Sequence, residues 1–346
     1  RDRFLTANLT YARALLENGD AATAHDVLVI ALARAGENFG PEALETWEAG
    51  GLLAVAKAEI GSNEDARRLF VTYVPPLMAR RAADGETASP IHDARAKFIA
   101  EAYLRQLANS GAAESAMKIA DGLRGRRLMA AISSSVARAA AKDGALANLV
   151  RRAQDGQTQR AALQRLLSGL LSSTARDDAS VTRIRRQLKT VSDAVQGLFD
   201  DIEQRFPDYA ELIRPRPSGA ADARPHLSPD EALISIYTSS RETFVWVARA
   251  DGAVAAHVAR IGAGEMAETV DHLREALDPG FIPSLDALPR FDVALAHDLY
   301  AALLEPLREH WSNAARLIFV TEGNLASLPL SILPTAPVAQ GPDDAI

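Results

Sequence analysis

The chain has 346 residues, of which 48% are hydrophobic and 24% charged, as is usual for globular domains with sizeable cores. Its formal net charge of -7 and its pI of about 5.6 argue against nucleic acid as a main partner, because phosphate binding requires a basic surface. The absence of cysteine excludes disulfides, thiolate metal sites and a cysteine nucleophile within these residues.

The sequence contains no apolar run long enough to cross a membrane and no signal peptide at its start, so we expect no membrane partner and a cytoplasmic location. The first residue is Arg1 rather than Met, and we therefore expect the chain to be a fragment of a longer protein. A signal peptide in that parent protein stays open.

Residues 1–150 have the 3.6-residue period of amphipathic helices joined in pairs by short turns. The turns Gly19-Asp20 and Gly61-Ser62 lie 42 positions apart (19 and 61), and Gly111 marks a third, after a helix that Ser89-Pro90 should begin. A weaker fourth copy runs from Met129 to Leu149. This self-similarity resembles tetratricopeptide (TPR) repeats with a longer period, and it predicts a helical solenoid. A generic helical bundle is the alternative.

Residues 151–213 predict a long antiparallel helical hairpin, in which two apolar stripes are separated by a polar segment at 172–180. The stripes consist of Leu163, Leu166, Leu167, Leu170 and Leu171, and of Ile184, Leu188, Val191, Val195 and Leu198. Basic residues at Arg124–Arg127 and Arg183–Lys189 have helical spacing, and we interpret them as solvated helix faces.

Beyond a linker that contains Pro215, Pro217, Gly219 and Pro225, the period changes to that of β-strands. We expect strands at 232–238, 243–250 and 253–260, the last two joined by a type I′ turn at Asp251-Gly252. Helices follow at 264–277 and 292–310, the second restarting at Pro306. The apolar strand at 316–321 is typical of a parallel, buried strand in an α/β domain.

No catalytic, cofactor-binding or metal-binding residue can be assigned from the sequence. The seven histidines (His25, His92, His226, His257, His272, His297 and His310) show no metal spacing, and we expect His257 to be exposed and His272 and His297 to be surface or half-buried residues. Gly262-Ala263-Gly264 is interpreted as a helix N-terminus rather than a nucleotide site. Ser239, Ser240 and Ser331 have no neighbouring base, and Asp230, Glu231, Asp298 and Glu322 are interpreted as caps and solvated charges.

The order and spacing of several short motifs in the second half resemble the front part of a CHAT domain, a caspase-like module found next to TPR repeats. These motifs are Phe206-Pro207-Asp208-Tyr209, Pro229 to Leu233, Asp251-Gly252, Leu299-Tyr300 with Leu303 to Leu307, and Leu317 to Leu330. The resemblance implies a mainly α chain with a C-terminal α/β part: TPR-like repeats at 1–150, a long hairpin at 151–213 and the N-terminal part of a caspase-like domain at 226–346.

The resemblance further implies cysteine-peptidase chemistry, in which a histidine activates a thiol that attacks a peptide carbonyl. No residue of this chain can be matched to that histidine or cysteine, and we expect both to follow Pro334 in the parent protein. We expect the repeats to bind a protein or peptide partner, without a cofactor. The alternative function is a non-enzymatic TPR scaffold with a degenerate CHAT domain.

Overall fold

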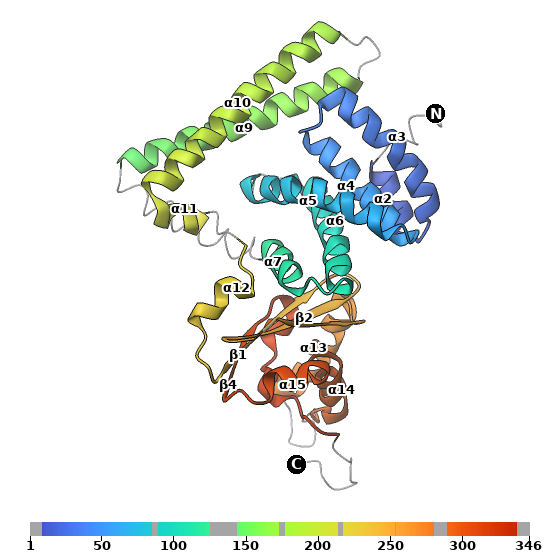
Figure 1. Cartoon of the computed structure of the whole chain (residues 1–346), viewed down its shortest axis with the longest axis vertical. Helices are drawn as coiled ribbons and strands as arrows, with labels where there is room; N and C mark the ends of the chain where they lie inside the picture. Colours follow the sequence, from blue (N-terminus) through green and yellow to red (C-terminus); the bar gives the residue numbers. More distant parts are fainter. Residues whose placement is uncertain are drawn as a thin grey trace. The chain divides into compact units, whose positions relative to one another are not determined.

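The computed structural model describes residues 9–84, 89–124, 144–172, 177–213, 217–252, 254–279 and 289–337. The chain is mainly helical, with a small four-stranded mixed sheet towards its C-terminus (Figure 1). It divides into two compact units: unit 1 comprises residues 1–103 and 125–216, and unit 2 comprises residues 104–124 and 217–346. Of the predicted fourth repeat (Met129 to Leu149), residues 129–143 lie outside the described residues.

Three helix pairs form the first part of the chain, where the sequence predicts repeats. Each pair is closed by the same turn: a glycine with positive φ follows the first helix at Gly19 (φ 80), Gly61 (φ 84) and Gly111 (φ 74). In each turn the next amide donates to a carbonyl five residues back, as from Asp20 to Leu15. The pairs are α2 (Leu9–Glu17) with α3 (Ala21–Phe39), α4 (Leu44–Glu59) with α5 (Asn63–Asp84), and α6 (Pro90–Asn109) with α7 (Ala113–Leu123).

Small residues let the helices of unit 1 approach closely. A Cβ atom added at Gly50 would lie 2.3 Å from the ring of Tyr73, and one at Gly51 would lie 2.7 Å from Ile99. The buried residues on these helices include many alanines, among them Ala12, Ala24, Ala49, Ala54, Ala56, Ala66 and Ala100. This packing explains why a chain with so few aromatic residues can form a dense helical unit.

The predicted long hairpin is present as α9 (Gly144–Ser172) and α10 (Asp178–Arg205), followed by the short helix α11 (Pro207–Ile213). The two long helices lie side by side along their length (Figure 1). Val181, Ile184 and Val195 of α10 are buried, and Gly156 of α9 leaves no room for a Cβ, which would lie 2.5 Å from Val195. Leu166 departs from the predicted stripe, because it is 49% exposed.

The sheet of unit 2 has the strand order β3-β2-β1-β4. β1 (Glu231–Thr238) is antiparallel to β2 (Thr243–Arg249) and parallel to β4 (Arg316–Val320), and β2 is antiparallel to β3 (Ala255–Ala259). These strands confirm those predicted from the sequence to within a few residues. β2 is covered on both faces, since every residue from Thr243 to Ala248 is buried.

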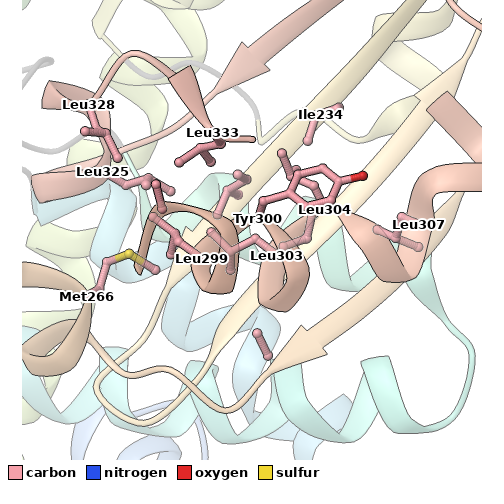
Figure 2. Close-up of a cluster of buried hydrophobic side chains, with 14 of the residues drawn as sticks. Ile234, Met266, Leu299, Tyr300, Leu303, Leu304, Leu307, Leu325, Leu328 and Leu333 are labelled. Carbon is pink, nitrogen blue, oxygen red and sulfur yellow. The ribbon is translucent and has the colours of Figure 1, made fainter. Parts of the chain in front are cut away.

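Helices α13 (Ala263–Leu277), α14 (Val293–Leu303) and α15 (Arg308–Trp311) cover one face of the sheet (Figure 1). The chain restarts at Pro306, as predicted, through a short 3-10 turn at Glu305–Leu307. In Figure 2, α14 presents Leu299, Tyr300 and Leu303 to Ile234 of β1. Leu325, Leu328 and Leu333, from the segment after β4, complete this core.

Helix α7 belongs to the sheet unit, although the sequence assigns it to the repeats. Glu114 accepts hydrogen bonds from the amide of Ala221 (2.8 Å) and from Arg224 (3.4 Å), and Asp121 accepts one from the amide of Ser218 (2.8 Å). The predicted linker is therefore partly ordered as α12 (Ala220–Ala223) and held against α7. The chain therefore passes from one compact unit to the other at 103/104, at 124/125 and, within the predicted linker, at 216/217.

Two other predictions require correction. The type I′ turn at Asp251-Gly252 is wrong: β2 and β3 form a hairpin, but neither residue has positive φ, and the register Val247↔Ala255 centres the connection on Asp251. The parallel strand at 316–320 is present, but most of its residues are exposed instead of buried.

Candidate functional site

The face of the sheet opposite α13 and α14 carries a partly buried arginine. Arg124 follows directly after α7, and its Nη1 donates a hydrogen bond to Oγ of Ser235 at 2.8 Å. Ser235 lies in the middle of β1 and is 1% exposed. Trp246 is its partner on β2, and Phe244 stacks on Trp246 with ring centroids 6.0 Å apart. A polar anchor thus joins α7 to an otherwise aromatic sheet face.

Nearby protein groups satisfy only part of the charge and of the hydrogen-bonding capacity of the Arg124 guanidinium. Burial lowers its pKa, and the nearby carboxylates of Glu322 and Asp121 act in the opposite direction. Its Nε and Nη2 atoms are buried without a protein hydrogen-bond partner. Glu322 follows β4 and Asp121 lies on α7, so the charge of Arg124 acts on carboxylates from both the sheet and its own helix.

The serines at the carboxyl end of β1 serve the backbone. The hydroxyl of Ser239 donates to the carbonyl of Glu242 at 2.8 Å and accepts from the amide of Glu242 at 3.0 Å. Its own carbonyl accepts from the amide of Ala263, which fixes the start of α13. Ser240 is exposed, and Ser331 is exposed in the 3-10 turn Leu330–Ile332. The structure therefore gives Ser239 a turn-forming role.

The carboxylates considered in the sequence are spread over the unit. Glu231 accepts from the amide of Ser228 (2.9 Å) and pairs with Arg316 (3.3 Å), which connects β1 to β4. The carbonyl of Asp230 accepts from the amides of Ala315 and Arg316. These contacts confirm the capping interpretation for Glu231. Asp298 lies on α14.

The histidines of unit 2 also make structural contacts. His257 is half-buried rather than exposed, because its Nε2 lies 3.2 Å from the carbonyl of Ala302. His297 is half-buried, as predicted, and lies 3.0 Å from the carbonyl of Pro334. Next to it, burial and the adjacent carboxylate of Glu305 raise the pKa of Tyr300 to about 12. Its hydroxyl therefore stays protonated and donates a hydrogen bond to Glu305.

The outer edge of β4 is the most unusual surface of unit 2. β4 is an edge strand in the described sheet, so one side of its backbone has no neighbouring strand there. Leu317 is 37% exposed, Ile318 39% and Val320 38%. An exposed edge strand with apolar side chains on both faces is a template for another strand, and natural proteins generally protect such edges with charges or a covering element.

Unit 1 contains a buried charge cluster that the sequence did not reveal. Glu48 of α4 has no exposed surface, accepts a hydrogen bond from Arg95 and lies 2.7 Å from Nδ1 of His92. Arg95 also donates to Thr10 at 3.2 Å, and a second pair joins Arg81 of α5 to Asp93 of α6 at 2.8 Å.

The electrostatics of this cluster favour its paired state. The hydrogen bond with Glu48 is the main cause of a raised pKa for His92, and burial raises the pKa of Glu45. Beside the cluster is a hollow of about 20 Å³, which can hold one water molecule. Its lining comprises Leu44, Leu77, Arg80, Arg81, His92, Asp93 and Ala96.

Within the described ranges, no group of three or more His, Cys, Asp or Glu residues could hold a metal ion. No helix among those residues is both long and apolar enough to cross a membrane. No model of a protein family, no curated protein and no solved structure matches the chain.

Proposed function

We propose that this chain is the sensor and non-catalytic front part of a TPR-CHAT protein, a caspase-like cysteine peptidase whose histidine and cysteine lie further along the parent polypeptide. The motifs from Phe206 to Leu330 suggest the family. The observation that carries the proposal is the uncovered edge of β4, with Leu317, Ile318 and Val320 exposed. A parallel strand with such side chains needs a further strand to bury them.

Burial supports this interpretation of β4. The opposite edge strand, β3, is protected, because His257 contacts α14 and Ala259 is buried. The neighbouring strand β1 is fully packed against the hydrophobic core, since Ala232, Ile234 and Ile236 are all nearly fully buried. Apolar exposure is therefore concentrated at the edge where a parallel sheet would grow, and the catalytic strands would be added there.

In the same proposal, the helix pairs form a TPR-like solenoid that binds a protein or peptide partner. Val29, Ile30 and Val71 are 46%, 44% and 53% exposed on these helices and would be suitable contacts. Helix α6 could transmit partner binding along the chain, because its residues up to Tyr103 belong to unit 1 and those from Leu104 onwards belong to unit 2. The last helix pair would then act on the sheet through α7 and Arg124.

The decisive experiment is to express this chain together with the polypeptide that follows it in the reading frame, and to assay cleavage of a fluorogenic peptide library. The proposal expects a histidine and a cysteine at strand ends, with activity that is lost when either is replaced by alanine. A frame without these residues, or activity that survives both replacements, would overturn the peptidase. The non-enzymatic scaffold would then be the function.

A second variant tests the edge of β4 directly. Ile318→Lys should change the stability of the present chain by less than about 0.5 kcal/mol, because the side chain is already exposed. In the longer protein it should abolish cleavage, since the lysine would be buried against the added strand. Leu277→Lys on α13, which also replaces an exposed apolar residue of unit 2, is the matched control and should leave cleavage intact. Full activity of the Ile318→Lys protein would contradict strand addition at this edge.

A further inference from the structure

The outward side of α10 carries charges in an unusual order. The first half of the helix carries the basic residues Arg186 and Lys189. The second half carries the acidic residues Asp193, Asp200 and Glu203, and Gln196 lies between Asp193 and Asp200. All six side chains are exposed. Successive members are three or four residues apart, so they form one continuous stripe along the helix, away from the buried Val181, Ile184, Val195 and Ile202.

Helix stability does not explain this order. The first and last turns follow the macrodipole, with Asp178 at the N-terminal end and Arg205 at the C-terminal end. Inside these turns the order is reversed: basic residues come first and acidic residues follow. The reversal brings only local support, such as the pair between Lys189 and Asp193 at 3.1 Å.

We propose that this stripe is a self-association surface, and that α10 pairs with α10 of a second copy of the chain in an antiparallel arrangement. If the two-fold axis passes between Ala194 and Val195, Arg186 of each copy faces Glu203 of the other. Lys189 of each copy then faces Asp200 of the other, and the two-fold axis makes four complementary pairs. A parallel arrangement would instead place like charges opposite each other. This surface is isologous, as two-fold dimers require.

Two features of α10 favour a second copy over other partners. The acidic half of the stripe would repel a phosphate-rich partner such as nucleic acid or an anionic membrane. Near the axis, Gly197 is exposed at the border of the stripe, next to Gln196, and no atom lies within 4 Å of a Cβ added there. Two helices can approach closely where the side chains at the contact are small. The inference does not depend on the proposed peptidase function.

Charge exchange tests the proposal on the 346-residue chain, by light scattering after size exclusion. At about 0.1 M salt, where charges interact over about 10 Å, the mass should approach twice 37.0 kDa as concentration rises. About 1 M salt should return it to one chain. The double variants Arg186→Glu with Lys189→Glu, and Asp200→Lys with Glu203→Lys, should each weaken association at least about tenfold. A 1:1 mixture of the two should dimerise again, since every facing pair is then complementary.

The matched control is Arg151→Glu with Arg152→Glu on α9, which changes the net charge by the same amount as Arg186→Glu with Lys189→Glu, at exposed positions outside the stripe. It should dimerise like the unmodified chain. Circular dichroism should show unchanged helix content in all variants, which separates lost association from unfolding. A chain that stays monomeric at low salt, or variants that dimerise alone, would overturn the proposal. So would a mixture that stays monomeric.

Discussion

The helical unit and the sheet unit bury different kinds of side chain. In unit 1 many of the buried residues are alanines, set among larger side chains such as Phe70 and Leu52, and the interior encloses the fully buried carboxylate of Glu48 with Arg95 and His92. In unit 2 the interior contains large side chains, including Trp246, Tyr300 and the leucines labelled in Figure 2. Polar contacts in this unit are isolated hydrogen bonds among apolar side chains, such as the one from Arg124 to Ser235.

This difference implies different sensitivity to mutation. A small-residue interior has little free volume, and a buried ion cluster loses its compensation when one member is removed. An interior of large apolar side chains gains most of its stability from buried area, so a single polar anchor contributes less. Unit 1 should therefore be the more fragile of the two, and variants at single positions can test this expectation.

The largest expected effect comes from Glu48→Ala. It leaves Arg95 buried without its carboxylate, and removing one partner of a buried pair costs about 3–5 kcal/mol. Hydrogen exchange across a urea series, followed on peptides from α4 and α6, measures the free energy of unfolding of unit 1 separately. Glu17→Ala, which breaks the exposed pair with Arg13, should cost less than about 1 kcal/mol. An equal loss of unfolding free energy in Glu48→Ala and Glu17→Ala would contradict the expectation that the buried cluster makes unit 1 fragile.

The next effect concerns close approach in unit 1. In Gly51→Ala the new Cβ would lie 2.7 Å from the buried Ile99, so we expect a loss of about 1–3 kcal/mol despite the better helix propensity of alanine. Gly36→Ala is the matched control, because no atom lies within 4 Å of its Cβ and the residue is also helical. It should stabilise the unit by about 0.5–1 kcal/mol. In the same hydrogen-exchange assay, the changes in unfolding free energy of the two variants should therefore have opposite signs.

Unit 2 should respond more weakly when its anchor is removed as a whole. Ser235→Ala leaves Nη1 of Arg124 buried without its acceptor and should cost about 1–3 kcal/mol. Adding Arg124→Met to that variant removes the charge as well and should recover stability to within about 1 kcal/mol of the unmodified chain. Exchange of β1 and β2 amides measures both. If the double variant were less stable than Ser235→Ala, the stability of unit 2 would also depend on the charge of Arg124.

Much of the fold could be predicted from the sequence because it is locally encoded. The turn glycines, the apolar periods and the change to strand spacing after 226 each depend on neighbouring residues. Arg124 and β4 show the limit. The partial burial of Arg124 depends on a strand more than a hundred positions away, and the exposure of an apolar strand depends on which strands lie next to it. The assignment of α7 to the sheet unit has the same long-range origin.

The charge cluster of unit 1 could have been found in part. Glu48 stands in the run Trp47-Glu48-Ala49-Gly50-Gly51-Leu52, whose later members lie in a buried helix segment. An acidic residue in such a run requires a cation, since a buried carboxylate is costly unless it is paired. The identity of the partners could not be deduced, because His92 and Arg95 are more than forty positions away and helix packing alone brings them together.

The smallest predicted effect is the pH dependence of that cluster. The hydrogen bond to Glu48 raises the pKa of His92 above its ordinary value of 6.5. A raised pKa in the folded state stabilises the protein fully below the unfolded value, and this contribution is lost as the pH rises through the folded value. Unit 1 should therefore lose stability from pH 6.5 upwards. The loss should stay below about 1 kcal/mol, because His92 is 35% exposed and solvent screens the pair.

The pH dependence is isolated by comparison with His92→Gln, which keeps a polar side chain at this position but cannot gain charge. The unfolding free energies of the two proteins, obtained by exchange of α4 and α6 amides, should differ most at pH 6 and approach each other as His92 loses its proton. The neighbouring charges on α4, α5 and α6 (Glu45, Glu48, Arg80, Arg81, Asp93 and Arg95) are present in both proteins. A difference that does not change with pH would show that the cluster depends on Arg95 alone.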